Sequence, residues 1–152
     1  MDENEYRAVY HTVNEVRCCF EKAMLTRRFG CQKLVKMNIA DREAAGCGNE
    51  ACKQTCLQVL QQLRANAAFA LKTTSTNSPL PHAKEIKAQC GGMIGLYQCL
   101  HPEETAIQGV DDIFGTISQA ITQFDGIEKL PYAEIVKTIT HFEGRKKRRS
   151  KR

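Results

Sequence analysis

Residues 46–56 read GCGNEACKQTC, and this run holds three of the eight cysteines of a 152-residue chain. Asn49 is a residue type that caps the first turn of a helix, so we expect a helix from about residue 50 to residue 72. Cys52 and Cys56 are four residues apart, and their sulfurs should project from the same side of that helix near its start. The run therefore predicts two thiols held side by side.

Helical periodicity dominates the rest of the chain. Apolar residues recur at three- and four-residue spacing, as the buried face of a helix requires, in four further segments: 3–28, 82–100, about 102–124 and about 131–142. Residues 31–46 predict a short helix or a packed loop, and no alternating strand pattern stands out. The linker 73–81 holds two prolines and small hydroxyl residues, which cannot continue a helix. We expect an all-α fold, a four-helix bundle-like core with an extra short C-terminal helix, in one domain over residues 1–143.

Positive charge is concentrated at the C-terminus. Seven of the last eight residues are basic: Arg145, Lys146, Lys147, Arg148, Arg149, Lys151 and Arg152. Residues 1–144 hold the other 15 Lys and Arg against 17 Asp and Glu, a net charge of −2. We expect the tail 144–152 to be disordered by itself, since like charges repel and nothing apolar is available to bury. It could bind phosphates of nucleic acid, anionic lipid or an acidic protein partner, or act only as a solubilising tail.

The compartment decides how the cysteines are interpreted. The N-terminus is acidic and lacks the apolar segment of an export signal, and no run approaches the about 18 apolar residues that span a bilayer. We therefore expect a cytoplasmic protein, in which stable disulfides are uncommon. The cysteines are then core thiols, metal ligands or redox-active groups.

Four cysteines form the candidate metal site: Cys31, Cys47, Cys52 and Cys56. Four thiolates can hold an iron–sulfur cluster or a structural zinc ion. Zinc sites usually contain two closely spaced ligand pairs. Here the second pair, Cys52-x3-Cys56, has that spacing, whereas fifteen residues separate Cys31 from Cys47. The irregular spacing makes an iron–sulfur cluster the first hypothesis and zinc the second. The competing interpretation is that these are ordinary buried thiols.

Three more cysteines, Cys18, Cys19 and Cys90, lie in segments that are predicted to be helices. Cys90 precedes two glycines, so we expect it to contact a large cofactor, or the glycines to allow close packing of another helix. Cys18 and Cys19 are adjacent, and on a helix their side chains would diverge by about 100°, which makes them poor joint ligands of one ion.

These observations give two functional hypotheses. The first is a small cytoplasmic iron–sulfur or other metal-binding helical protein for electron transfer or redox sensing, acting with a redox partner protein. The second is a module that binds nucleic acid or an acidic partner through the basic tail, with the cysteines as core thiols. No carboxylate pair, catalytic triad or phosphate-binding loop stands out, so enzymatic activity is the least supported class.

Overall fold

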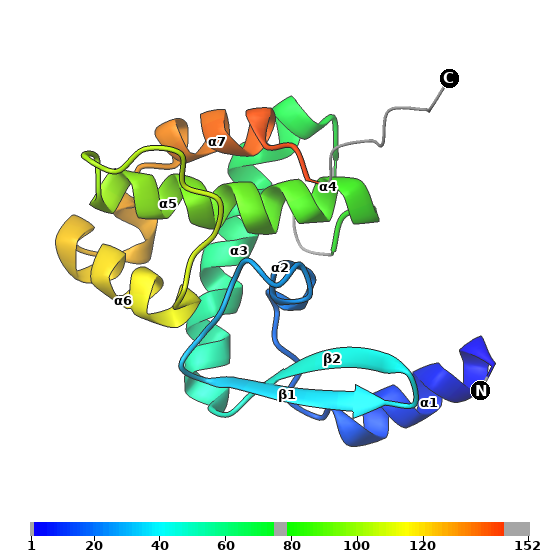
Figure 1. The fold of residues 1–152 in the computed structure, drawn as a ribbon. Helices are drawn as coiled ribbons and strands as arrows, with labels where there is room; N and C mark the ends of the chain where they lie inside the picture. The colour runs from blue at the N-terminus through cyan, green and yellow to red at the C-terminus, as the bar shows by residue number, and fades with distance from the viewer. Residues whose placement is uncertain (1, 75–78, 145–152) are drawn as a thin grey trace.

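The computed structural model describes residues 2–74 and 79–144 (Figure 1). Its elements, in chain order, are α1 (Glu3–Val13), α2 (Glu21–Met24), β1 (Leu34–Ile39), β2 (Arg42–Cys47), α3 (Glu50–Leu71), α4 (His82–Ile86), a π-helical stretch (Lys87–Gly91), α5 (Gly92–Leu100), α6 (Ile113–Phe124), a 3-10 turn (Ile127–Lys129) and α7 (Tyr132–His141). Among the helices of these two ranges, none has the length and apolar character needed to cross a membrane. The seven basic residues of the predicted tail lie outside the described residues.

A β-hairpin replaces the helix or loop expected over residues 31–46, so the all-α prediction of a four-helix bundle-like core is wrong. β1 and β2 pair antiparallel, with Leu34 opposite Cys47 and Ile39 opposite Arg42. The two residues between the strands begin with Ala40, whose φ of 56° is in the left-handed region. Figure 1 shows the hairpin lying across the lower end of α3, beside α1.

The predicted helix over 3–28 is also wrong, because the chain leaves the helix after Val13. The side chain of Asn14 is buried and its Nδ2 donates to Ala45 O of β2 at 3.1 Å. The buried carboxylate of Glu21 accepts from Ala45 N at 2.8 Å and from the hydroxyl of Tyr10 at 2.9 Å. Buried polar groups are costly unless they are hydrogen-bonded, so these contacts hold the segment between α1 and α2 against the hairpin.

The fourth long helix begins about ten residues later than the sequence predicts. Pro102 lies two residues after the end of α5, and residues 101–112 form an irregular connection. α6 starts only after Asp112, whose carboxylate accepts from the N–H of Gly115 at 3.1 Å and so caps the first turn. The helix predicted over 82–100 is present, with a π-helical stretch inside it. α7 matches the predicted short C-terminal helix to within about a turn.

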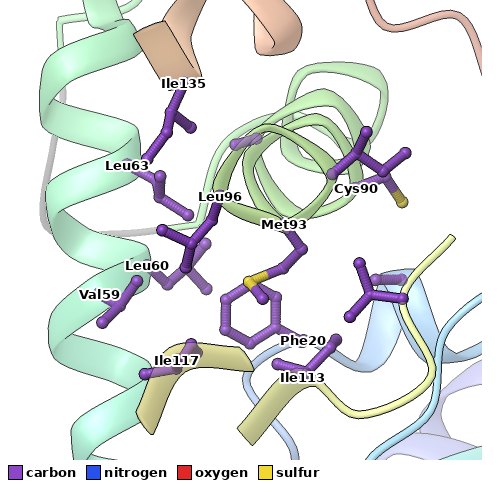
Figure 2. Close-up of a cluster of buried hydrophobic side chains, with 14 of the residues drawn as sticks. Phe20, Val59, Leu60, Leu63, Cys90, Met93, Leu96, Ile113, Ile117 and Ile135 are labelled. Carbon is purple, nitrogen blue, oxygen red and sulfur yellow. The ribbon is translucent and has the colours of Figure 1, made fainter. Parts of the chain in front are cut away.

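The core lies where α3, α5, α6 and α7 meet. Figure 2 shows Phe20 and Met93 facing one another among residues from these helices, and all of the labelled residues are almost entirely buried. Gly91 and Gly95 explain how α5 and α7 come so close. A Cβ on Gly91 would lie 2.7 Å from Ile139 Cα, and one on Gly95 would lie 3.1 Å from Ile135 Cα. The glycines therefore serve close packing of two helices, one of the two alternatives that the sequence left open.

One ion pair is buried within the helical body. Arg64 of α3 donates from Nε to Glu85 Oε1 of α4 at 2.6 Å, and the two side chains are 5% and 1% exposed. Charges this deep are retained only when paired and hydrogen-bonded. The pair fixes α4 against the middle of α3.

Candidate metal centre

Six cysteine side chains line one small cavity, of about 20 Å³, at the lower end of α3. Four of them are the predicted ligands Cys31, Cys47, Cys52 and Cys56, which the structure brings together. The other two, Cys18 and Cys19, were not predicted as ligands. All eight cysteines of the chain lie in the described residues and are free thiols.

Cys52 and Cys56 are placed by the start of α3. The side chain of Asn49 accepts from the N–H of Cys52 at 3.0 Å, which confirms the predicted cap. Cys47 ends β2 two residues earlier, and its N–H donates to Val16 O at 2.7 Å. The three cysteines of the GCGNEACKQTC run thus come from the end of a strand and the first two turns of a helix.

Cys18 and Cys19 reach the cavity because their segment is not helical. The N–H of Cys18 donates to Ala45 O at 3.0 Å, and Arg17 forms an isolated antiparallel bridge with Gly46. This short stretch acts as a third strand on the free side of β2. Outside a helix the fixed divergence of about 100° between adjacent side chains does not apply, so both cysteines can face one site.

Cys31 is held from the opposite side by the start of α6. Gly30 donates to Val110 O at 2.9 Å and accepts from Ile113 N at 2.8 Å. A Cβ on Gly30 would lie 2.6 Å from Asp111 O, so only glycine allows this approach. These bonds pin the residue before Cys31 to the helical body, while the cysteine itself points to the cavity.

Several contacts inside the cluster suit sulfur in its anionic form. The N–H of Lys33 donates to Cys31 Sγ at 3.5 Å. The backbone of Phe20 likewise hydrogen-bonds to the sulfur of Cys18. In both cases the donor lies two residues after the cysteine. Hydrogen bonds to a thiolate stabilise the charged form. Lys33 and Lys53 line the cavity and add positive potential.

Burial opposes ionisation of the same thiols. It raises the pKa of Cys18 to about 12, and it also raises the pKa of Cys31. The pKa of Cys56 is raised first by a hydrogen bond with Cys19 and then by burial. These thiols therefore keep their protons at neutral pH until a cation replaces them, and they are poor nucleophiles in that state.

The spacing of the sulfurs limits which metal centre fits. Across residues 2–74 and 79–144, no three cysteine sulfurs lie within 4.8 Å of one another. Four thiolates around a single tetrahedral zinc ion, at about 2.3 Å each, would be separated by only about 3.8 Å. The sulfurs must therefore close inward around a single ion, or surround more than one metal atom. The donors themselves, thiolates alone, suit zinc and iron–sulfur clusters.

The remaining two cysteines lie elsewhere. Cys90 is fully buried in the core, and in Figure 2 its sulfur points away from Phe20 and Met93. It is absent from the residues that line the cavity, so the predicted contact of Cys90 with a cofactor shared with the six cysteines of the cavity is not what the structure shows. Cys99 is partly buried on α5, and burial raises its pKa.

A second group of donor atoms lies at the end of α5, where one atom each of His101, Glu103 and Glu104 falls within 4.8 Å of the others. The sequence did not predict these three residues as ligands. The group is at the surface, and Glu104 already accepts from the hydroxyl of Tyr97 at 3.3 Å. The sequence signal that could have indicated this group is the run His-Pro-Glu-Glu at residues 101–104, which places three donor residues within four positions.

A groove of about 740 Å³ lies beside the last described residues. Its charged and aromatic lining consists of Arg28, Lys137, His141, Phe142 and Glu143, and Gly144 completes its edge. The basic residues 145–152 are joined to the chain at this edge. The groove thus adds cationic side chains of the folded body to the charge that the sequence places in the tail.

No family model, curated protein or solved structure matches the chain. Function is therefore inferred from the cysteine cavity and the groove.

Proposed function

We propose that the chain is a metal-binding protein whose thiolate centre is formed by the six cysteines of the cavity. The observation that carries the proposal is their convergence: four stretches separated in sequence, which belong to different kinds of element, direct their cysteines to one place. A buried cysteine is common as a small core residue. Six around a space of about 20 Å³, with backbone N–H groups aimed at two of the sulfurs, are better accounted for as ligands.

The size of the cavity supports zinc as the metal. A space of about 20 Å³ is close to that of one water molecule, which suits one or two ions drawn between thiolates more than a preformed cluster. Two tetrahedral zinc ions that share two bridging thiolates need six cysteines, and a single ion needs four. An iron–sulfur cluster on Cys31, Cys47, Cys52 and Cys56 is the other candidate, and it requires the cavity to widen.

The metal would add a further link between parts of the fold that hydrogen bonds already hold together, such as those of Cys18 N–H with Ala45 O and of Cys47 N–H with Val16 O. Its ligands belong to the hairpin, to the segment before α2, to the loop before β1 and to the first turns of α3. With all positions taken by thiolates, a zinc centre serves structure or redox sensing through its thiols, whereas an iron–sulfur cluster would also serve electron transfer. Neither leaves a site for a substrate. Because the thiols must stay reduced to bind, the proposal places the protein in a reducing compartment such as the cytoplasm.

Metal analysis of the full-length protein, purified anaerobically, tests the proposal. We expect bound zinc and, after exchange with Co²⁺, the intense near-ultraviolet absorption of thiolate ligation, with protons released as the metal enters. Bound iron with acid-labile sulfide and visible absorption would instead identify the cluster. Protein that stays folded and takes up neither zinc, Co²⁺ nor iron and sulfide under reducing conditions would contradict both.

A second candidate function is supported by the groove beside the basic tail: binding of single-stranded nucleic acid. Arg28 and Lys137 provide cations for phosphates, and Phe142 provides an aromatic face on which a base could stack. Arg28 has no ion-pair partner within residues 2–74 and 79–144, whereas Lys137 pairs with Glu134 at 3.0 Å on the surface, where such pairs are weak. Both cations are therefore available to a polyanion.

Charge reversal tests the groove. In the full-length chain, Arg28→Glu combined with Lys137→Glu should weaken binding of a labelled single-stranded RNA by about tenfold or more and reduce the salt dependence of the affinity. The matched control is Arg27→Glu with Lys129→Glu, because Arg27 pairs with Glu43 on the hairpin and Lys129 pairs with Asp125, both away from the groove. Equal losses in the two double variants would show a non-specific charge effect and remove the groove from the proposal.

A further inference from the structure

The solvent-facing side of α3 is unusual for a surface helix because it lacks charge. Between Lys53 and Lys72 the one charged residue is Arg64, and it is buried against Glu85. A helix exposed to water on one side normally carries charged residues there. Here the exposed residues between Lys53 and Lys72 are glutamine, alanine, asparagine and one phenylalanine.

The exposed residues also follow a regular spacing. Six positions, alternately four and three residues apart, run along one line of the helix: Ala51, Thr55, Gln58, Gln62, Ala65 and Phe69, and Lys72 follows three residues later, just past the helix end. Five of the six helical positions are exposed, as is Lys72, and Thr55 is partly buried. An average spacing of 3.5 residues is the repeat by which one helix packs along another over its whole length.

Phe69 is the strongest single indication that this face is covered. Its side chain is 97% exposed, more than any other large apolar residue of the described chain. A phenyl ring left in water loses the stabilisation that burial would provide. Contiguous exposed apolar surface marks an interaction site, and Phe69 lies one turn from the exposed Ala65 on the same side of the helix.

The face is complementary to itself. If two α3 helices run antiparallel with Gln62 near a twofold axis, then Phe69 lies opposite the smaller Thr55, and Gln58 lies opposite Ala65. Glu50 is the first residue of α3 and Lys72 directly follows its last, so the antiparallel arrangement brings each carboxylate to the end of the partner helix that carries the ammonium group. A parallel arrangement would place like charges together at both ends. Charge and side-chain size therefore both favour a second copy of this chain as the partner, with its α3 antiparallel to the first.

We propose that α3 is a dimerisation helix, which pairs antiparallel with α3 of a second copy and buries Phe69 against the partner's Ala51 and Thr55. The helix has 22 residues, which gives a contact about 33 Å long. A contact between two single helices is at the small end of specific protein interfaces, so the dimer dissociates on dilution. The inference is independent of the metal centre, because the cysteines point from the other side of the same helix.

Sedimentation velocity of the full-length protein over a range of concentrations tests the dimer. We expect the wild-type chain to shift reversibly from monomer to dimer, and Phe69→Glu to weaken dimerisation at least about tenfold, since the substitution buries a charge in the packed seam opposite the partner's Thr55. The matched control is Val13→Glu on α1, a large apolar residue that is 51% exposed and away from α3. It should leave the dimer unchanged.

Exchange of charges tests the direction of pairing. Glu50→Lys and Lys72→Glu should each weaken the dimer, and the double variant should restore it, because the ion pairs re-form with reversed sign. A dimer that the double variant fails to restore would overturn the antiparallel arrangement. If the wild-type protein stays monomeric up to its solubility limit, the proposal that a second copy of the chain covers this face is wrong.

Discussion

Cys52→Ser combined with Cys56→Ser is expected to abolish metal binding and to loosen the hairpin. Both sulfurs lie on the first two turns of α3, and no cysteine of the helical core is placed to substitute for them. In small domains a structural zinc site supplies an apparent folding free energy of about 10–16 kcal/mol. Here α3, α5, α6 and α7 share an extensive apolar core, so the loss should be confined to the elements around the cavity.

Two measurements should be made on the same samples. Metal content per chain should fall to the background value, and amide hydrogen exchange should increase over residues 34–47 while the α5 and α7 amides keep their protection. Cys99→Ser is the matched control, because Cys99 is partly buried on α5 and outside the cavity. Full metal content in the double variant would show that the α3 cysteines are not ligands.

The same experiment on Cys18→Ser with Cys19→Ser separates a six-cysteine centre from a four-cysteine centre. A decrease in the metal content per chain would show that these two residues are ligands, as the cavity indicates. Unchanged metal content would leave Cys31, Cys47, Cys52 and Cys56 as a sufficient set.

Removal of one partner of the buried ion pair should produce the largest loss of stability in the helical body. Arg64→Ala, or Glu85→Ala separately, leaves a charge buried without a counterion, and such changes cost about 3–5 kcal/mol in the free energy of unfolding. The side chains are 5% and 1% exposed, so little solvent screening offsets the cost. Urea denaturation followed by circular dichroism measures the change, provided that the slope of the transition is unchanged.

The matched variant replaces both partners by apolar side chains of similar volume, Arg64→Met with Glu85→Leu. It should recover most of the lost stability, because no unpaired charge remains. A single variant that loses less than about 1 kcal/mol would show that water reaches the pair and that the interior at this place is not dry.

Local sequence signals predicted α3, its Asn49 cap and the helical stretches around α5 and α7, because each combines strong periodicity with an end signal. The hairpin was missed for physical reasons. β2 reads Arg-Glu-Ala-Ala-Gly-Cys, whose residues favour helices or turns rather than strands, and the turn at Ala40 lacks the Asn-Gly or Asp-Gly signal of a tight hairpin. The strand is stabilised by distant partners, including Cys18 N–H and the carboxylate of Glu21.

The same error hid a third of the candidate centre. The helix predicted over 3–28 placed Cys18 and Cys19 on diverging sides, whereas their pairing with β2 brings both to the cavity. The four predicted ligands could be identified because they are close together in the sequence and because two of them lie at the predicted start of α3. Tertiary contacts between the hairpin and the segment before α2 cannot be inferred from spacing alone.

The π-helical stretch Lys87–Gly91 has a consequence for the tolerance of this helix to insertions and deletions. It contains one residue more than an α-helix of the same rise would need. A chain one residue shorter here could form an uninterrupted α-helix, but α4 would then be rotated by about 100° relative to α5. Glu85 would turn away from Arg64 while Gly91 and Gly95 stayed against α7. Homologues of this protein should therefore vary in sequence along this helix far more readily than in its length.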